Sequence, residues 1–497
     1  MPVVPLLLNA AEALRPVRVT GRARGWPVFR QDCAEYSMFY APGCLCVVSL
    51  ADAAWFEATL APPQISPESK PSADAIDSRD WGAELWRSAD RAMTRATLWQ
   101  TEPFSPECLT LYMNNECNLR CVYCHTDPSP RPVERLELEA ITAAAQVVAE
   151  HCRRKGRPLY VVFHGGGEPT LHRQRVAMAM KQLEAVANAH GVGLFRYVAT
   201  NGVMTEQKAR WLARCFDLVG LSCDGPPDIQ NSQRPRWDGG DTSHLVERTA
   251  HILREEGRRF QVRTTITRAT LDRQAEIVDY VCRQFLPEEI HYEPTYLGGR
   301  TNAAIGLDAS YADRFVAHFL EARQVAQGYG VRLSSSGSRL GSIHGPYCHV
   351  FRHVVNLVPG GLATACFKIT RADQVEAKGA AIGRQNGQTK GFEIEYPRVR
   401  ALRQRLNGAL PGCTECFNLY HCVRECPDYC PLDQDDHPIH DLSTPGFRCQ
   451  VQKALAYATL RETAQRLWAT VVAEKPAECE ANAYGELRRI VHGTTLL

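Results

Sequence analysis

From Leu109 to about Thr295 the sequence alternates short apolar runs with longer amphipathic stretches. The short runs have the length and β-branched content of buried strands, and the longer stretches repeat their apolar residues at helical spacing. This alternation predicts βα units that form a parallel sheet. The predicted strands cover residues 109–113, 159–164, 195–200, 218–224, 260–267 and 289–295, and the predicted helices cover residues 136–153, 174–190, 206–215, 244–256 and 273–285. Six such repeats predict an α/β fold, an open, partial (β/α)6 barrel.

The sequence on either side of this repeat follows other patterns. We expect the barrel over residues 107–315 and a connecting segment over residues 316–346. Before it, residues 1–106 predict a small α+β unit with strands in 17–24 and 37–50, a Pro/Ser-rich loop at 61–74 and a helix at 80–99. After it, residues 347–450 lack apolar periodicity and predict a core made of inorganic clusters, and residues 451–497 predict a C-terminal helical segment.

Composition decides how the many cysteines are interpreted. The chain has 497 residues, more than one hydrophobic core usually organises, and it has 20 cysteines. Its 57 Lys and Arg nearly balance its 55 Asp and Glu, so net charge gives no reason to expect a nucleic-acid partner. The first residues lack a basic signal region and no run of about eighteen apolar residues occurs, so we expect neither export nor a membrane span. We therefore expect a cytoplasmic protein whose thiols bind metal.

Three cysteines directly follow the first predicted strand. Cys117, Cys121 and Cys124 form a CxxxCxxC loop, and barrel enzymes carry their active sites at this end of the strands. Three thiolates at this spacing can hold one corner of a [4Fe–4S] cluster, which normally takes four cysteines, so one iron would stay open. A structural zinc site is the alternative, with His125 as the nearest further ligand.

With this loop, the chain resembles the radical S-adenosylmethionine (SAM) superfamily over about residues 108–300. The resemblance implies that the open iron binds SAM, and that reductive cleavage of SAM yields a 5′-deoxyadenosyl radical that abstracts hydrogen from a substrate. The segment FHGGGEPTL after the second strand resembles the GGEP motif of that family. Its residues here are Gly166, Gly167, Glu168 and Pro169. The glycines would let the backbone approach SAM, and the carboxylate would pair with the SAM ammonium; a plain tight turn is the alternative.

Further polar residues lie at the ends of the later strands. The resemblance implies contacts with the ribose or carboxylate of SAM for Thr200, Asn201, Ser222 and Asp224. Arg263 suits bidentate pairing with a carboxylate. The resemblance also places Tyr123 where relatives have an aromatic residue whose backbone faces adenine. A hydrogen-bonded loop group is an equally good interpretation of each.

A second set of cysteines resembles the SPASM domain, which carries two auxiliary [4Fe–4S] clusters. The resemblance implies an outer cluster on Cys413, Cys416, Cys422 and Cys449, and an inner cluster on Cys348, Cys366 and Cys426. Full members often have one more cysteine upstream, where this chain offers only Ser342 and His344. The inner cluster then has an open iron or a substitute ligand such as Cys430 or His344; zinc knuckles are the alternative for the whole set. Three [4Fe–4S] clusters and SAM are the cofactors implied.

The combined resemblance implies a maturase that forms a crosslink, a cyclophane or a thioether, in a ribosomally made precursor peptide encoded nearby. A flavodoxin or ferredoxin would be the reductant. Anaerobic sulfatase maturases share the layout and make formylglycine, but they place an Asp base just after the second inner-cluster cysteine, where this chain has Phe367. Maturation of a protein subunit is a further alternative. A non-catalytic iron–sulfur electron carrier is another, although a carrier needs neither an open iron nor a GGEP motif.

The unit over residues 1–106 is open to two interpretations. It is expected either to bind a leader peptide by strand addition or only to pack on the barrel.

Overall fold

A computed structural model describes the greater part of the chain. The described residues are 15–17, 28–60, 81–126, 132–337, 339–374, 377–406, 413, 416–424, 426, 445–473 and 488–492. The expected Pro/Ser-rich loop at 61–74 and most of the expected strand at 17–24 lie outside these ranges.

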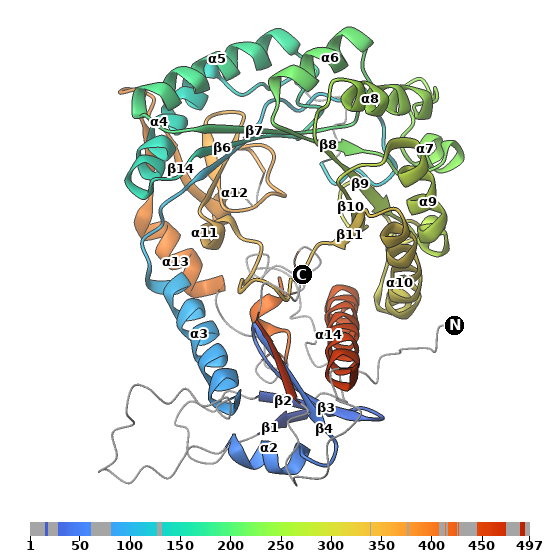
Figure 1. Ribbon diagram of the computed structural model, residues 1–497. Coiled ribbons are helices and arrows are strands. Elements are labelled where there is room, and N and C mark those ends of the chain that lie inside the picture. The colour runs from blue at the N-terminus through green and yellow to red at the C-terminus, as the bar shows by residue number, and fades with distance from the viewer. Residues whose placement is uncertain are drawn as a thin grey trace.

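A curved parallel sheet forms the centre of the molecule (Figure 1). Its neighbouring strands, in chain order, are β5 (Cys108–Tyr112), β6 (Leu159–His164), β7 (Leu194–Thr200), β8 (Leu218–Ser222), β9 (Phe260–Ile266), β10 (Glu289–Pro294) and β11 (Arg332–Ser335). The α/β fold and the six strands expected from the alternation are confirmed. The seventh strand, β11, lies within the segment that we expected to be only a connection, because its four residues are too few to show a period.

Helices cover the outer face of this sheet (Figure 1). They are α4 (Leu138–Lys155), α5 (Arg173–His190), α6 (Glu206–Cys215), α7 (Pro227–Gln233), α8 (Ser243–Glu255), α9 (Gln274–Phe285) and α10 (Ala312–Gly328). In β9 the residues alternate strictly between buried and half-buried, so Val262 packs in the apolar core while Arg263 is half-buried. The same alternation in β6 buries Phe163 in the core and leaves His164 half-buried. Polar side chains of both strands therefore line the concave side.

The cysteine-dense region continues this sheet at its other edge. The strand β12 (Val354–Val358) pairs in parallel with β5, and β13 (Leu362–Thr364), β14 (Ala381–Gln385) and β15 (Phe392–Ile394) follow antiparallel. Their apolar side chains, such as Leu357 and Ile382, belong to the same hydrophobic core as the barrel. The expectation that this region has only an inorganic core is therefore wrong for residues 354–394, where the strands are too short to reveal a period.

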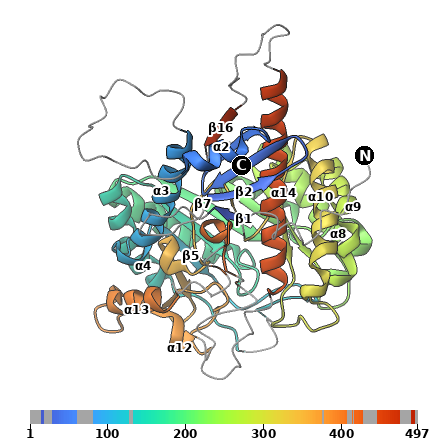
Figure 2. The same ribbon diagram turned by 90° about the horizontal axis from the view of Figure 1, so that it is seen from below.

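The N-terminal residues form a second, antiparallel sheet. It contains β1 (Arg15–Val17), β2 (Val28–Asp32), β3 (Tyr36–Ala41) and β4 (Cys44–Ser49), and the helices α2 (Ala53–Thr59) and α3 (Trp81–Thr101) follow. One face packs on α2 and α3, and the other packs on α14 (Phe447–Ala473), as Figure 2 shows.

A fifth strand of this sheet comes from the far end of the chain. The strand β16 (Arg488–His492) pairs antiparallel with β4. The expected C-terminal helical segment, residues 451–497, is thus helical only to Ala473 within the described residues, and residues 488–492 are a strand. Tertiary pairing decides the conformation of so short a segment. Among the described residues, no helix is both long enough and apolar enough to cross a membrane.

Candidate functional site

The cysteine loop begins immediately after β5. Cys117, Cys121 and Cys124 are all half-buried in it, and their thiols lie close enough to interact electrostatically. Burial raises the pKa of Cys117 to about 12 and that of Cys121 to about 11, and the neighbouring thiols add to both shifts. These protein surroundings alone do not stabilise thiolates, so cationic iron would have to supply that stabilisation. A loop of three clustered, poorly solvated thiols fits such a group.

The glycine turn after β6 is hydrogen-bonded to this loop. Gly167 N–H donates to the Asn114 carbonyl (2.9 Å), and Glu168 N–H donates to the Glu116 carbonyl (2.7 Å). A Cβ on Gly167 would lie 1.8 Å from the Glu116 oxygen, and one on Gly166 would lie 2.9 Å from the Asn114 oxygen. The glycines are therefore required because this turn contacts the backbone of the cysteine loop.

The Glu168 carboxylate is buried and already accepts several hydrogen bonds. Thr170 donates through its N–H (3.1 Å) and its hydroxyl (2.5 Å), Thr200 through its hydroxyl (2.8 Å) and Asn201 through its N–H (2.8 Å). Glu168 Oε1 takes three of these donors and Oε2 takes one, so one lone pair of Oε2 remains for a further donor. Glu168 thus joins the ends of β6 and β7, and its pairing with the SAM ammonium stays a prediction.

Asp224 lies at the centre of a second buried network. Its Oδ2 accepts hydrogen bonds from the Tyr123 hydroxyl (2.5 Å) and Gln233 Nε2 (2.9 Å), and it lies 3.0 Å from Arg234 Nε. Its Oδ1 accepts from Thr265 N–H (3.0 Å). The Arg234 guanidinium also lies over the Tyr123 ring, 5.3 Å from the ring centroid. Asp224 and Tyr123 therefore bind each other and Arg234, a residue that no sequence motif indicated; their contacts with SAM stay predictions, as does that of the half-buried Ser222.

Two more segments hold the backbone of the cysteine loop. Arg120 N–H donates to the Pro235 carbonyl (2.8 Å), and Trp237 Nε1 donates to the Cys117 carbonyl (2.9 Å). After β10, Arg300 N–H donates to the Cys124 carbonyl (3.0 Å). Gly299 has φ +58°, and a Cβ there would lie 2.2 Å from the same carbonyl oxygen. The loop is thus fixed by the segments after β6, β8 and β10.

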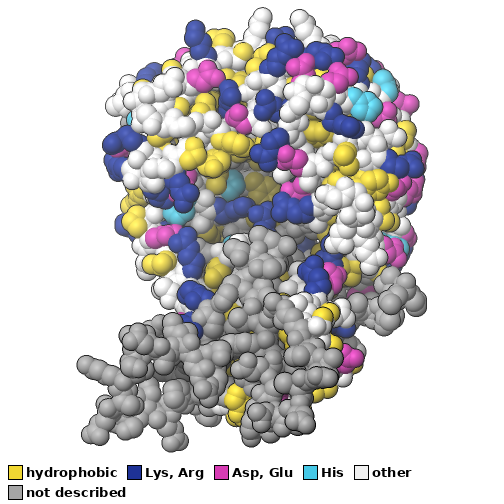
Figure 3. Space-filling view, in the orientation of Figure 1, with side chains coloured by type: hydrophobic (Ala, Val, Ile, Leu, Met, Phe, Trp, Pro, Cys, Tyr) yellow, Lys and Arg dark blue, Asp and Glu magenta, His cyan; other side chains and the backbone are white. Residues whose placement is uncertain are grey.

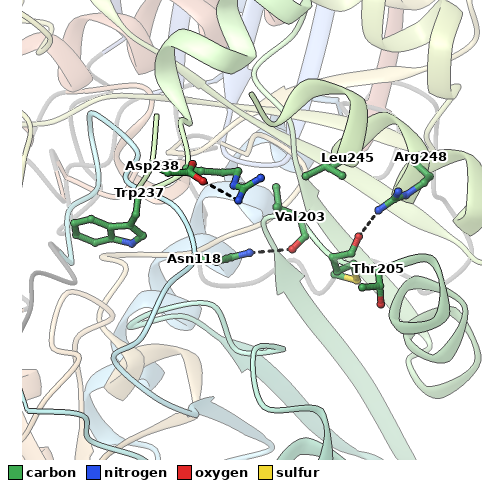
Figure 4. Close-up of a pocket in the computed structure, with 9 residues that line it drawn as sticks. Asn118, Val203, Thr205, Trp237, Asp238, Leu245 and Arg248 are labelled. Carbon is green, nitrogen blue, oxygen red and sulfur yellow. Dashed lines mark hydrogen bonds and ion pairs between the residues drawn. The ribbon is translucent and has the colours of Figure 1, made fainter. Parts of the chain in front are cut away.

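A pocket of about 460 Å³ opens beside this loop (Figure 4). Its lining residues are Asn118, Val203, Met204, Thr205, Arg236, Trp237, Asp238, Leu245 and Arg248. Asn118 Nδ2 donates to the Val203 carbonyl (2.9 Å), and the Arg248 guanidinium donates to the Met204 carbonyl (2.6 Å). This lining includes none of the residues expected to contact SAM, but Asn118 accepts a hydrogen bond from Asn201 Nδ2 (2.8 Å), so the pocket adjoins that predicted site.

Aromatic rings and imidazoles gather on the concave side of the sheet. His125 packs against Tyr296 (centroids 5.9 Å apart) and Phe367 (6.4 Å), and Phe367 also packs against Tyr347 (6.3 Å). His164 packs against Tyr112 (5.7 Å) at the end of β6. In Figure 3 this face of the molecule is hollowed, with hydrophobic side chains in its depth and Lys and Arg side chains along its rim.

The charged groups of this interior are unevenly paired. Burial would raise the pKa of Glu293, but the Arg448 guanidinium (2.9 Å) and hydrogen bonds from His291 and Ser336 lower it to about 2. Burial and, to a smaller extent, the nearby Arg263 lower the pKa of His164 to about 3. Arg263 pairs with no carboxylate among the described residues, so its predicted role as a carboxylate clamp is compatible with its position.

The distal cysteines are brought together only in part. Burial raises the pKa of Cys422 well above its usual range, and the thiols of Cys449, Cys416 and Cys413 contribute, so the expected outer set is close in space. In the expected inner set, the backbones of Cys348 and Cys366 are neighbours, because His349 N–H donates to the Ala365 carbonyl (2.9 Å). Cys426 closes a turn with Val423, and Cys430 lies outside the described residues. Across the described part of the chain no three His, Cys, Asp or Glu side chains are arranged to hold a metal ion, so the ligand assignments stay predictions.

Comparison with known proteins identifies the barrel. Residues 111–281 match the family model of the radical SAM superfamily. The chain therefore contains a radical SAM domain, and such a domain implies one [4Fe–4S] cluster and SAM.

Individual curated proteins are similar to parts of the chain. The chain is similar to the cysteine-type anaerobic sulfatase-maturating enzyme of Clostridium perfringens, with 28% identity over 167 residues, 33% of this chain and 45% of the relative. It is also similar to the probable GTP 3',8-cyclase of Archaeoglobus fulgidus, with 28% identity over 143 residues, 28% of this chain and 42% of the relative. The chain thus spans less than half the length of these curated relatives.

A solved structure extends the likeness over more of the chain. The structure of native anSMEcpe with bound AdoMet matches with a TM-score of 0.56 and 18% identity, covering 72% of this chain and 99% of that one. At this identity the likeness shows a shared fold.

Proposed function

We propose that this protein is a radical SAM maturase that abstracts a hydrogen from a side chain of a ribosomal precursor peptide and then forms a crosslink, a cyclophane or a thioether. The radical SAM domain supports the class of chemistry. A peptide substrate is supported by the structure of native anSMEcpe with bound AdoMet and Kp18Cys peptide, which matches with a TM-score of 0.54 and 20% identity over 72% of this chain and 99% of that one.

In this proposal each cofactor has a set of residues from this chain. Cys117, Cys121 and Cys124 would hold the cluster that, with SAM, supplies the hydrogen-abstracting radical. The protein's part is to fix the loop through Gly167 and Arg300 and to surround it with a concave face that excludes water. The distal cysteines would hold two further clusters, which suits a reaction that removes electrons from the substrate.

The side chains around Phe367 favour crosslink formation over formylglycine formation. A formylglycine-forming site of the related maturases has a carboxylate base at this position, and here a phenyl ring packs between Tyr347 and His125. Glu293, which interacts electrostatically with both His125 and Tyr347, is paired with Arg448 and has a pKa of about 2, so it is a weak proton acceptor. An apolar, aromatic lining suits the packing of an aromatic or aliphatic substrate side chain against it.

Formylglycine formation is the second candidate, because a sulfatase maturase is among the similar proteins. A flavodoxin or ferredoxin as reductant, a cytoplasmic location and a peptide-binding role of residues 1–106 belong to the same proposal. The antiparallel sheet of that unit supports the last of these, because strand addition extends an existing sheet.

Tandem mass spectrometry distinguishes the two reactions. The protein is incubated anaerobically with SAM, reductant and each small peptide encoded beside its gene. Loss of two hydrogens, with fragments missing inside a ring, is the expected result. Conversion of Cys or Ser to an aldehyde would instead establish the sulfatase-maturase reaction. Phe367→Asp is the informative variant, because only in the second case should a carboxylate there increase the aldehyde yield.

A further inference from the structure

Trp237 lies at the surface although it contacts the cysteine loop directly. It is 43% exposed, and its indole N–H donates to the Cys117 carbonyl (2.9 Å). Two guanidinium groups from different segments lie over its ring, that of Arg120 at 5.7 Å and that of Arg300 at 5.2 Å from the ring centroid. These contacts fix the indole in place at the surface. Exposed Trp and Arg side chains held together in this way are typical of a binding surface.

The charged residues around Trp237 are mostly basic. We call this surface the Trp237 patch; it consists of Trp237, the two arginines over its ring and the other residues that line the adjoining pocket. Four arginines and one aspartate belong to it. Arg236 and Asp238 are exposed and pair with each other (2.8 Å), whereas Arg120 and Arg248 pair with no carboxylate among the described residues. The patch therefore has a net positive charge and fits an acidic partner.

The patch also has an apolar part and a direct connection to the predicted cluster. The pocket of about 460 Å³ extends from Trp237, and its apolar lining residues are Val203, Met204 and Leu245 (Figure 4). The hydrogen bond of the indole leads to the backbone of Cys117, which would be an iron ligand. An electron that arrives at the indole therefore reaches the cluster across one hydrogen bond and the covalent bonds of one residue.

We propose that the Trp237 patch is the docking site of a flavodoxin, an acidic one-electron carrier, which reduces the cluster of the barrel loop. The proposal rests on the proposed function, because each reductive cleavage of SAM consumes one electron. In the transfer, the anionic flavin hydroquinone loses one electron and becomes the neutral semiquinone, and the oxidised [4Fe–4S] cluster gains that electron; no bond forms or breaks. The planar flavin suits contact with the indole, and acidic residues around the flavin suit the arginines.

Binding is tested with the reconstituted protein and a purified flavodoxin in its oxidised form, without SAM or peptide. Biolayer interferometry on immobilised flavodoxin gives the dissociation constant. Arg120→Glu and Arg236→Glu should each weaken binding by about tenfold, because each places a negative charge against an acidic surface. Asp238→Asn should strengthen binding, because it removes the negative charge of the patch. Raising the salt concentration from about 0.05 M to about 0.5 M should weaken binding to the unaltered protein.

Arg157→Glu is the matched control. Arg157 is exposed and lies between α4 and β6, at the amino ends of the parallel strands, whereas the cysteine loop lies at their carboxyl ends. The charge change is the same, so binding should stay within about twofold of that of the unaltered protein. Circular dichroism and iron content confirm the folding and loading of each variant, and Arg236→Glu serves alone should Arg120→Glu not fold.

A second measurement tests whether electrons enter through this patch. The rate of 5′-deoxyadenosine formation is measured with limiting flavodoxin hydroquinone and, separately, with dithionite, a small reductant that needs no docking surface. The ratio of the two rates cancels any effect of a substitution on the cluster itself. This ratio should fall by about tenfold in Arg120→Glu and stay unchanged in Arg157→Glu.

The proposal would be overturned if the unaltered protein did not bind flavodoxin, or if Arg120→Glu and Arg157→Glu bound it equally well. An unchanged ratio of rates in Arg120→Glu would overturn it too. Flavodoxin-dependent SAM cleavage by a protein that modifies no peptide, with the ratio lowered in Arg120→Glu, would refute the proposed function and leave the docking site standing.

Discussion

The two groups of cysteines are held in different ways. The barrel loop with Cys117 is fixed by the ends of regular strands, through Gly167 after β6, Trp237 after β8 and Arg300 after β10. The segment with Cys422 pairs instead with an irregular stretch, where Val423 N–H donates to the Gly337 carbonyl (3.0 Å) and His344 N–H to the Tyr420 carbonyl (2.7 Å). The difference indicates that the regular strands determine the conformation of the barrel loop. The conformation of the segment with Cys422 depends more on the group that its thiols bind.

The largest expected effect separates the chemistry of the two groups. Cys117→Ala should reduce formation of 5′-deoxyadenosine to the detection limit, because only the barrel loop would hold the cluster that binds SAM. Cys422→Ala should retain measurable SAM cleavage. Both are measured by chromatography of anaerobic reactions, with circular dichroism to confirm folding. Cleavage of SAM by Cys117→Ala would show that the active cluster lies elsewhere.

The next effect tests whether the fold itself shapes the barrel site. Asp224→Asn leaves the buried Arg234 without its carboxylate and should lower the free energy of unfolding by about 3–5 kcal/mol. The matched control, Asp238→Asn, breaks an exposed pair with Arg236 and should cost about 1 kcal/mol or less. Urea denaturation measures both. Similar losses of unfolding free energy in the two variants would show that the buried pair stabilises the protein no more than the exposed pair does.

A smaller effect is expected at the glycine turn. Gly167→Ala places a methyl group against the Glu116 carbonyl and should destabilise the protein by about 1–3 kcal/mol. Gly328→Ala is the control, because a Cβ at that helical position meets no atom within 4 Å, and it should be neutral or stabilising by up to about 1 kcal/mol. Thermal unfolding compares them. A neutral Gly167→Ala would show that the turn can move away from the cysteine loop.

The smallest effect concerns the response to loss of iron. Full anaerobic reconstitution should give about twelve iron atoms per chain, from three four-iron clusters. After chelation, amide hydrogen exchange should quicken by about threefold to tenfold in residues 416–424, which corresponds to about 0.7–1.4 kcal/mol, and change less in residues 114–124. An iron content near four, or equal loss of protection in the two segments, would remove the proposed difference between the sites.

The pattern of apolar residues along the sequence was sufficient to predict the strands and helices of the barrel. The run from Leu159 to His164 is predicted as a strand and is β6 with the same bounds, because a short, continuous run of β-branched and aromatic residues is typical of a buried parallel strand. The cysteine spacing and the GGEP motif also predicted the loop after β5 and the turn after β6, which are hydrogen-bonded to each other in the structure. The sequence did not indicate Arg234 or Trp237, since neither belongs to a periodic pattern or to a motif.

The sequence by itself determined the βα order, the position of the cysteine loop after β5, and the position of the glycine turn after β6. Only the tertiary structure decided that β12 extends the barrel sheet beside β5, that Arg234 pairs with Asp224, and that β16 completes the sheet at β4. Local periods reflect which face of a segment is buried, and they carry no information about its partner. Strand pairings between residues hundreds of positions apart are fixed by which unpaired edge remains once the local elements have formed, and the pairing of Arg234 with Asp224 is fixed by which buried charge needs a partner.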